Sequence, residues 1–268
     1  MLVLNSFSFN ATKTLQSNTF LGLIVGENII TLQRVNSTND YLKSNLSNST
    51  PYTEGTVIMA VEQYAGKGQA GNIWKSEPGK NLTCSVLLNP TFLLPKDQFD
   101  LNIAVSLAIA DTLQPILGEN LRIKWPNDLY YLDKKIGGIL IENILRGSSW
   151  KHAIIGIALN VNQTVFGDNQ ARASSLKLLL NQDFEINTLL QSLCYHLSTE
   201  YQRLKEKHII QQKSRYRSLL YRLGEPANFL VQGQHKSGTV IDVNKEGKLI
   251  VDFDGQLTEH AIKEIAFI

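Results

Sequence analysis

Two patterns of apolar residues alternate along the first half of the chain. Apolar residues between positions 101 and 109 recur at intervals of three and four, which predicts the buried face of a helix that begins near Asp97. Short apolar runs rich in β-branched residues predict buried strands at residues 29–35, 56–61 and 82–88. The chain therefore mixes both element types from its first hundred residues onward.

The N-terminal segment carries little apolar pattern. It is rich in Asn, Ser and Thr as far as Thr19, and we predict that it is irregular until the first strand. Ser37 opens a Ser-Thr-Asn-Asp run with N-cap chemistry, which predicts a short helix through Leu42.

The second half of the chain changes character twice. Turn signals separate four further predicted strands at residues 121–125, 129–132, 135–145 and 152–161. A long, polar-faced helical stretch is predicted at residues 187–221. After Gly224, Gly-containing turns separate short alternating strands at residues 229–232, 236–243, 249–253 and 258–262.

These patterns predict an α+β protein of two domains with a boundary near Leu223. Residues 1–223 would form a mixed β-sheet with flanking helices, and residues 224–268 a small β-barrel. A chain of 268 residues is long enough for such a division.

Composition and charge exclude several classes of protein. Hydrophobic residues make up 43% and charged residues 19%, which is ordinary for a globular protein and too apolar for wholesale disorder. A net charge of +2 supplies no strong field for nucleic acid or an acidic membrane. Cys84 and Cys194 form no CxxC pair, which argues against a disulfide scaffold or structural zinc. With no membrane-length apolar run and no signal-like N-terminus, we expect a cytoplasmic protein.

Residues 66–74, here called the glycine loop, follow a predicted strand. Gly66, Gly68 and Gly71 allow the backbone to approach an anion closely, Lys67 adds a positive charge, and Trp74 supplies a flat ring. The spacing matches neither the Rossmann nor the Walker pattern, so a phosphate-and-ring site and a flexible surface turn are both open. Since the loop has little apolar content, we predict that nothing pins it when the site is empty.

A second motif reads Lys-Trp-Pro-Asn-Asp at residues 124–128, followed by an apolar strand that Lys135 opens. Asp128 could hold a divalent cation, and Lys135 would point its ammonium into the mouth of a hairpin. Gly137 and Gly138 weaken the strand, which indicates that something packs against the backbone there. The alternative is a solvated hairpin with two ordinary surface lysines, Lys134 and Lys135.

A third run, residues 155–162, has strand periodicity but ends in asparagines. Asn160 could be placed for hydrogen bonding at the end of the sheet, or it could simply terminate the strand.

Taken together and in this order, the motifs resemble the biotin protein ligases, in a monofunctional form without a DNA-binding domain. The Lys-Trp-Pro-Asn-Asp and Lys-Lys-Ile-Gly-Gly-Ile-Leu-Ile-Glu blocks carry most of the resemblance, which runs from about Val35 through Asn162. It implies a class II synthetase-like catalytic domain and an SH3-like C-terminal domain. It also implies that ATP and Mg²⁺ serve to activate biotin as biotinoyl-5′-AMP, which then acylates one lysine of a biotin carboxyl carrier domain.

The resemblance also implies roles for individual residues. Lys135 and Lys67 would be catalytic, and Asp128 would lie in the Mg²⁺ region. Residues matching the biotin-binding positions are Ser37, Thr38, Asn39, Gln63, Gly66, Lys67, Gly68, Lys135, Gly137 and Gly138. Residues matching the ATP-binding positions are Trp74, Asn127, Asp128, Lys135 and Asn160. The two glycines of the strand would leave a slot for the rings of biotin.

The chain departs from the family in its glycine loop, which carries one positive charge where arginine-rich loops carry four. We therefore expect looser retention of the adenylate. A lipoate–protein ligase or octanoyltransferase shares the expected fold but lacks the paired motifs. A non-catalytic sensor would need a DNA-binding element, and no basic helix is present, so we expect no nucleic-acid partner. Both a monomer and a homodimer remain open.

Overall fold

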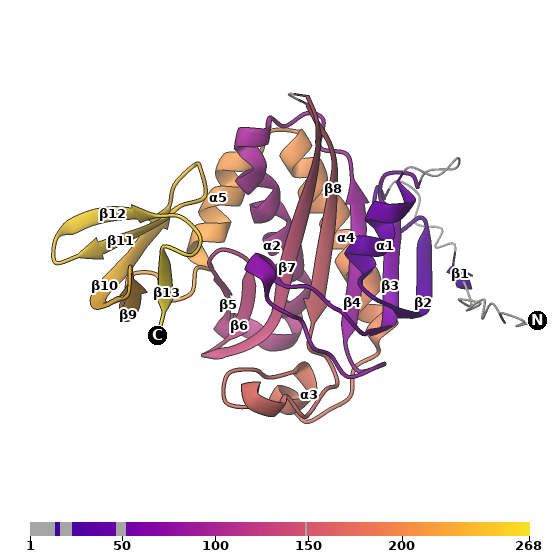
Figure 1. Cartoon of the computed structure of the whole chain (residues 1–268), viewed down its shortest axis with the longest axis horizontal. Helices are drawn as coiled ribbons and strands as arrows, with labels where there is room; N and C mark the ends of the chain where they lie inside the picture. Colours follow the sequence, from indigo (N-terminus) through magenta and orange to yellow (C-terminus); the bar gives the residue numbers. More distant parts are fainter. Residues whose placement is uncertain (1–13, 17–22, 47–51, 148) are drawn as a thin grey trace, which may run out of the picture.

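An eight-stranded mixed sheet forms the larger part of the protein, in a computed structural model that describes residues 14–16, 23–46, 52–147 and 149–268 (Figure 1). Among the described strands, β2 and β3 pair in parallel and all other neighbours are antiparallel. In spatial order the strands are β1 (Thr14–Gln16), β2 (Ile29–Val35), β3 (Val57–Gln63), β4 (Leu82–Leu88), β8 (Ser149–Leu159), β7 (Lys134–Arg146), β6 (Asp128–Tyr131) and β5 (Leu121–Lys124).

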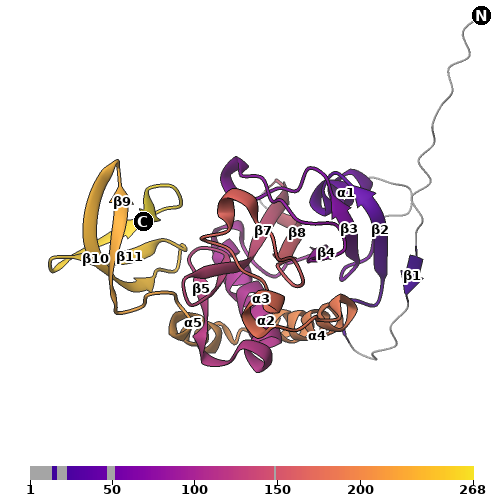
Figure 2. The same ribbon diagram turned by 90° about the horizontal axis from the view of Figure 1, so that it is seen from below.

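Helices cover the two faces of this sheet unequally (Figure 2). One face is covered by α2 (Gln98–Leu117), α4 (Ile186–Lys205) and α5 (Ile209–Ser218), whose apolar sides complete the main core. On the other face, the helix that packs within the described part of the chain is the short α1 (Thr38–Asn45), which buries Leu42 in a cluster with apolar residues of β2, β3, β4 and β8. The rest of that face is left to loops, and it is where the candidate site lies.

The helix α2 is long and apolar enough to cross a membrane by length and composition, with a mean hydropathy of 1.4 over its window. Two thirds of that window is buried inside the protein, where α2 packs against the sheet and against α4 and α5. Its apolar character is therefore explained by its place in the core.

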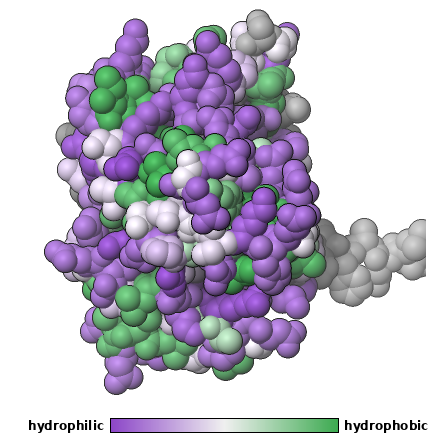
Figure 3. Space-filling view, turned by 90° about the vertical axis from the view of Figure 1, so that its left-hand side faces the viewer, coloured by the Kyte–Doolittle hydropathy of each residue, from purple (hydrophilic) through white to green (hydrophobic). Residues whose placement is uncertain are grey.

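A five-stranded antiparallel sheet follows at the C-terminus, as the sequence predicts for an SH3-like module. Its strands lie in the order β12 (Gln256–His260), β11 (Leu249–Phe253), β10 (Gln234–Val243), β9 (Pro226–Val231) and β13 (Ile265–Phe267). The face of the molecule formed by this module is mostly hydrophilic, with several separate apolar patches (Figure 3).

The two sheets touch through the motif at residues 124–128. The Trp125 indole donates from Nε1 to the Gly247 carbonyl at 2.9 Å. The Lys124 ammonium lies 4.7, 5.7 and 5.0 Å from the ring centroids of Tyr130, Tyr221 and Phe267, the last from the C-terminal sheet. Burial lowers the pKa of Lys124. The turn that supplies the site thus also carries the contact between the two sheets.

The structure differs from the predicted elements in four places. Residues 187–221 form two helices, because the chain turns between them at Lys207, which has a φ of 65°. The helix α3 (Leu176–Leu180) and the last strand β13 are too short for periodicity to reveal. Residues 14–16, predicted to be irregular, pair with β2, while residues 1–13 and 17–19 lie outside the described residues.

Candidate active site

A cavity of about 210 Å³ opens between α1, the glycine loop, the β6–β7 hairpin and β8. The sequence predicts fourteen site residues, and eleven of them line this cavity: Ser37, Thr38, Asn39, Gln63, Lys67, Gly68, Trp74, Asn127, Asp128, Lys135 and Gly138. Segments up to a hundred residues apart in the chain therefore meet at one place, as the resemblance implies.

One end of the cavity carries a cluster of buried polar side chains around Ser85 on β4. The Ser85 hydroxyl lies 2.6 Å from both Thr38 Oγ1 and Asn39 Oδ1. Thr38 in turn donates to Gln63 Oε1 from its hydroxyl at 3.0 Å and from its backbone N–H at 2.8 Å. Three contacts between oxygens share only two hydroxyl protons, so the cluster is one donor short. The cavity-facing oxygens of the cluster are therefore suited to accept hydrogen bonds from ligand N–H groups.

Asn39 is held rigidly within this cluster. Its amide donates to Glu142 Oε2 on β7 at 2.8 Å, so its oxygen faces Ser85. On the neighbouring strand, Gly156 leaves the room that Asn39 occupies, because a Cβ atom there would lie 2.6 Å from Asn39 Oδ1. Ser37 is buried beside the cluster and does not cap α1 with its side chain.

The other end of the cavity holds an ion pair on the β6–β7 hairpin. Lys135 Nζ lies 2.6 Å from Asp128 Oδ1, and both side chains are about one-third exposed or less. Gly138 makes room for the pair, since a Cβ atom there would lie 3.1 Å from Asp128 Oδ1. Main-chain bonds fix Lys135 on both sides: its N–H donates to Arg172 and its carbonyl accepts from Ser174.

Trp74 covers this ion pair from the end of the glycine loop. Lys135 Nζ lies 5.6 Å from the centroid of the Trp74 ring, within cation–π range. The indole Nε1 is buried and has no hydrogen-bond partner. Because a buried donor without a partner is costly, this N–H is suited to an acceptor on a ligand.

The glycine loop is folded into a small hairpin rather than left unpinned. Lys67 and Ile73 form a β-bridge, Gly68 N–H donates to Asn72 at 2.7 Å, and Trp74 N–H donates to Gly66 at 2.9 Å. These main-chain hydrogen bonds give the loop a defined shape but run within it, so the expectation that the loop orders over a bound ligand stays a prediction.

Three predicted residues do not line the cavity. Gly66 lies where a Cβ atom would be 2.6 Å from the Trp74 carbonyl, so it permits the closed turn of the loop. Gly137 faces β8, where a Cβ atom would meet Leu159 Cδ2 at 2.6 Å, and so the predicted slot is open at Gly138 alone. Asn160 is buried and donates to the Ser174 carbonyl at 3.0 Å, which fastens the following loop to the sheet.

Other residues of the site escaped the sequence analysis. In the sequence, Ser85 stands out only as an isolated polar residue, and Gly156 only as an isolated small residue, each inside an apolar strand. Lys134, beside the predicted Lys135, lies off the cavity, and its ammonium makes an exposed hydrogen bond to the Ala171 carbonyl at 2.5 Å. Asn127 lines the cavity and also donates to the Ile139 carbonyl, so it holds the hairpin together.

The segment that carries this site is similar to a known protein family. Residues 31–160 match the Biotin/lipoate A/B protein ligase family. The bifunctional ligase/repressor BirA of Escherichia coli is 26% identical over 244 residues, covering 90% of this chain and 74% of that protein. The biotin protein ligase of Aquifex aeolicus, solved with biotin and ATP, superposes with a TM-score of 0.76 at 27% identity, covering 91% of this chain and 99% of that one. This chain is a homologue of the biotin protein ligases.

A second relative supports the same conclusion. The biotin–protein ligase of Homo sapiens is 33% identical over 142 residues, which cover 51% of this chain and 19% of that protein. For a biotin protein ligase homologue, the donors available for a metal are few. Among the described residues no three His, Cys, Asp or Glu side chains gather, and Asp128 is the carboxylate that lines the cavity. One carboxylate suits Mg²⁺, which keeps several waters and binds substrate phosphates, but not a metal held in a protein cage.

Proposed function

We propose that this protein is a biotin–protein ligase that activates biotin with ATP and transfers it to a lysine of a biotin carboxyl carrier domain. One observation carries the proposal: a polar cluster that is short of hydrogen-bond donors and a lysine–carboxylate pair both line the same cavity. A ureido ring offers N–H groups to the first, and a carboxylate or phosphate is attracted to the second.

The polar end would bind the ureido ring. Thr38 and Asn39, which Ser85 contacts from behind, would present oxygen lone pairs to the ring N–H groups. The amide of Gln63, oriented by Thr38, presents its NH₂ group to an acceptor. This arrangement would fix the position of biotin so that its carboxylate reaches toward Lys135.

In the first step a carboxylate oxygen of biotin attacks the α-phosphorus of ATP, and the bond to pyrophosphate breaks. Both reactants are anions, so the reaction needs a fixed positive charge between them. We assign this role to Lys135, with Lys67 as a second cation at the cavity wall. The indole of Trp74 and the wall at Asn127 would hold the nucleotide. Asn160 would support that wall from behind.

In the second step the amine of the carrier lysine attacks the acyl carbon of the adenylate. The bond to the phosphate oxygen breaks, AMP leaves, and the amine loses a proton. Mg²⁺ would be held by Asp128 and by the phosphates, and would neutralise phosphate charge. We further propose a domain boundary near residue 223 and a cytoplasmic location, where carrier domains of biotin-dependent carboxylases would be the partners.

The test is to incubate the protein with biotin, Mg-ATP and a biotin carrier domain, and to measure the mass of the carrier. Biotinylation of one carrier lysine, with release of AMP and pyrophosphate, is the expected result. Transfer of lipoate in preference to biotin in a competition assay would favour a lipoate ligase instead. No acyl transfer from either acid would overturn the proposal.

A further inference from the structure

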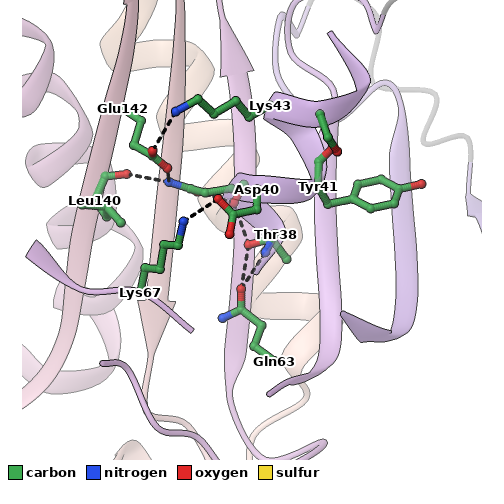
Figure 4. Close-up of polar contacts among 11 residues, drawn as sticks. Thr38, Asp40, Tyr41, Lys43, Gln63, Lys67, Leu140 and Glu142 are labelled. Atoms are coloured by element: carbon green, nitrogen blue, oxygen red, sulfur yellow. Dashed lines mark hydrogen bonds and ion pairs between the residues drawn. The ribbon is translucent and has the colours of Figure 1, made fainter. Parts of the chain in front are cut away.

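The glycine loop is tied to helix α1 by one ion pair. Lys67 Nζ lies 2.5 Å from Asp40 Oδ1, in the first turn of α1 (Figure 4). The hydrogen bond to Asp40 raises the pKa of Lys67 against the slight effect of burial. The ammonium of the loop lysine is therefore directed to a protein carboxylate on α1.

A second carboxylate faces the same ammonium. Glu142 on β7 attracts Lys67, while its own oxygens contact Asn39 and, at 3.5 Å, Lys43 (Figure 4). Lys67 thus lies among acidic groups contributed by two elements, α1 and β7. This places the charged end of the loop across the space between these elements.

The loop also separates two hollows. Lys67, Gly68, Asn72 and Ile73 line the candidate site, and they also line an outer hollow of about 490 Å³ that reaches Glu142. A molecule leaving the site on this side must pass the loop. The loop therefore forms a partition between the candidate site and the outer hollow.

Besides the packing of Trp74 over Lys135 at the end of the loop, few contacts hold this partition in place. Among the described residues, the Lys67–Asp40 contact is the one hydrogen bond or ion pair that joins residues 66–74 to another element. The remaining hydrogen bonds of the loop run within it, between Gly66 and Trp74 and between Gly68 and Asn72. They keep the shape of the loop but do not fix it to the body of the protein.

We propose that Asp40 is a positioning residue that latches the glycine loop shut through Lys67 and so slows the escape of the bound adenylate. The ligand in this proposal, biotinoyl-5′-AMP, rests on the proposed function. What the proposal adds is a part for Asp40 in retaining that ligand. The ion pair also compensates for the low positive charge of the loop. An arginine-rich loop would hold the phosphate of the adenylate directly, whereas this loop is held to the protein through Asp40. An ion pair this exposed has a modest strength, so the expected effect is about two- to fivefold.

The experiment compares wild type with Asp40→Asn and with the charge-exchanged double variant Asp40→Lys/Lys67→Asp. Two quantities are measured: stopped-flow release of preformed biotinoyl-5′-AMP, and amide exchange of residues 66–74 without ligand. Asp183→Asn is the matched control, since it removes a partner from the exposed Lys177–Asp183 pair, whose residues line neither hollow.

We expect Asp40→Asn to release the adenylate about two- to fivefold faster and to exchange loop amides faster, with both effects absent in Asp183→Asn. Added salt should speed release from wild type and change Asp40→Asn little. The double variant should restore slow amide exchange, which a merely structural role of Asp40 would not predict. Equal release and exchange in Asp40→Asn and wild type would overturn the latch. If wild type forms no adenylate, the proposed function fails, and the amide exchange still decides whether the loop is latched.

Discussion

The β6–β7 hairpin and the glycine loop each contribute a lysine to the cavity, but the two lysines are held in different ways. Lys135 lies near the start of β7, where its N–H and its carbonyl both bond to the main chain of the loop at Arg172 and Ser174 and its ammonium makes a short contact to Asp128. Lys67 lies in a loop whose hydrogen bonds are internal, and its link to the rest of the protein is the ion pair with Asp40.

This difference separates two tasks. Groups that stabilise charge during a reaction must be fixed before it begins, and the register of a sheet provides that. A cover over the ligand must instead open and close, and an element with few outside contacts can do so at low cost. We therefore expect substitutions in the hairpin to change chemistry or stability, and substitutions in the loop to change retention.

The largest effect is expected at Lys135. Lys135→Ala removes the fixed positive charge and should lower the rate of pyrophosphate release by about 10²–10³-fold without unfolding the protein. Lys134→Ala is the control, because Lys134 contacts only a carbonyl of the neighbouring loop and lies off the cavity. Wild-type turnover in Lys135→Ala would contradict the assignment of the hairpin as the part of the site that stabilises charge during the reaction.

One glycine substitution in the β6–β7 hairpin and one in the glycine loop give a second test, which measures protein stability. Gly137→Ala places a Cβ atom 2.9 Å from the Ala158 carbonyl and should lower the free energy of unfolding by about 2 to 3 kcal/mol. Gly71 has a φ of 88° with open space around it, so Gly71→Ala should cost only about 1 kcal/mol of backbone strain. Urea denaturation measures both. Equal losses would mean that the hairpin yields as readily as the loop.

The sequence predicts the β6–β7 hairpin and the glycine loop unequally well. Apolar runs located most strands, and the motif order located Lys135 and Asp128, because both signals are local in the chain. The contacts that Gly137 and Gly138 make depend on how β7 pairs with β8. No local sequence pattern reports that pairing. The pairs Ser85–Asn39 and Lys67–Asp40 join residues 46 and 27 positions apart, and only the folded chain reveals them.

Trp74 joins the two walls, and its loss should have an intermediate effect. Trp74→Phe keeps a ring over Lys135 but removes the indole N–H, which has no partner in the free protein. If that N–H bonds to the nucleotide, KM for ATP should rise about five- to tenfold, the value of one hydrogen bond. Trp74→Phe should not lower the thermal stability by removing a hydrogen bond, because the indole N–H makes none among the described residues of the free protein. An unchanged KM would show that the ring alone matters.

The smallest effect is expected at Gln69, where the loop lacks a charge that arginine-rich loops carry. Gln69 begins a short 3₁₀ turn and lines the cavity, so an arginine there can reach the same space. A charge-assisted hydrogen bond is roughly twice as strong as a neutral one, so Gln69→Arg should lengthen the residence time of biotinoyl-5′-AMP about two- to fivefold.

Stopped-flow release from wild type, Gln69→Arg and the uncharged Gln69→Met would measure this effect. Slower release from Gln69→Arg alone would show that charge in the loop governs retention, whereas the rate of pyrophosphate formation should stay near wild type because Lys135 is untouched. Release from Gln69→Arg as fast as wild type or faster would mean that the glutamine is itself a fitted contact. Retention would then depend on the shape of the loop and on its latch to Asp40, and the count of its charges would be the wrong guide.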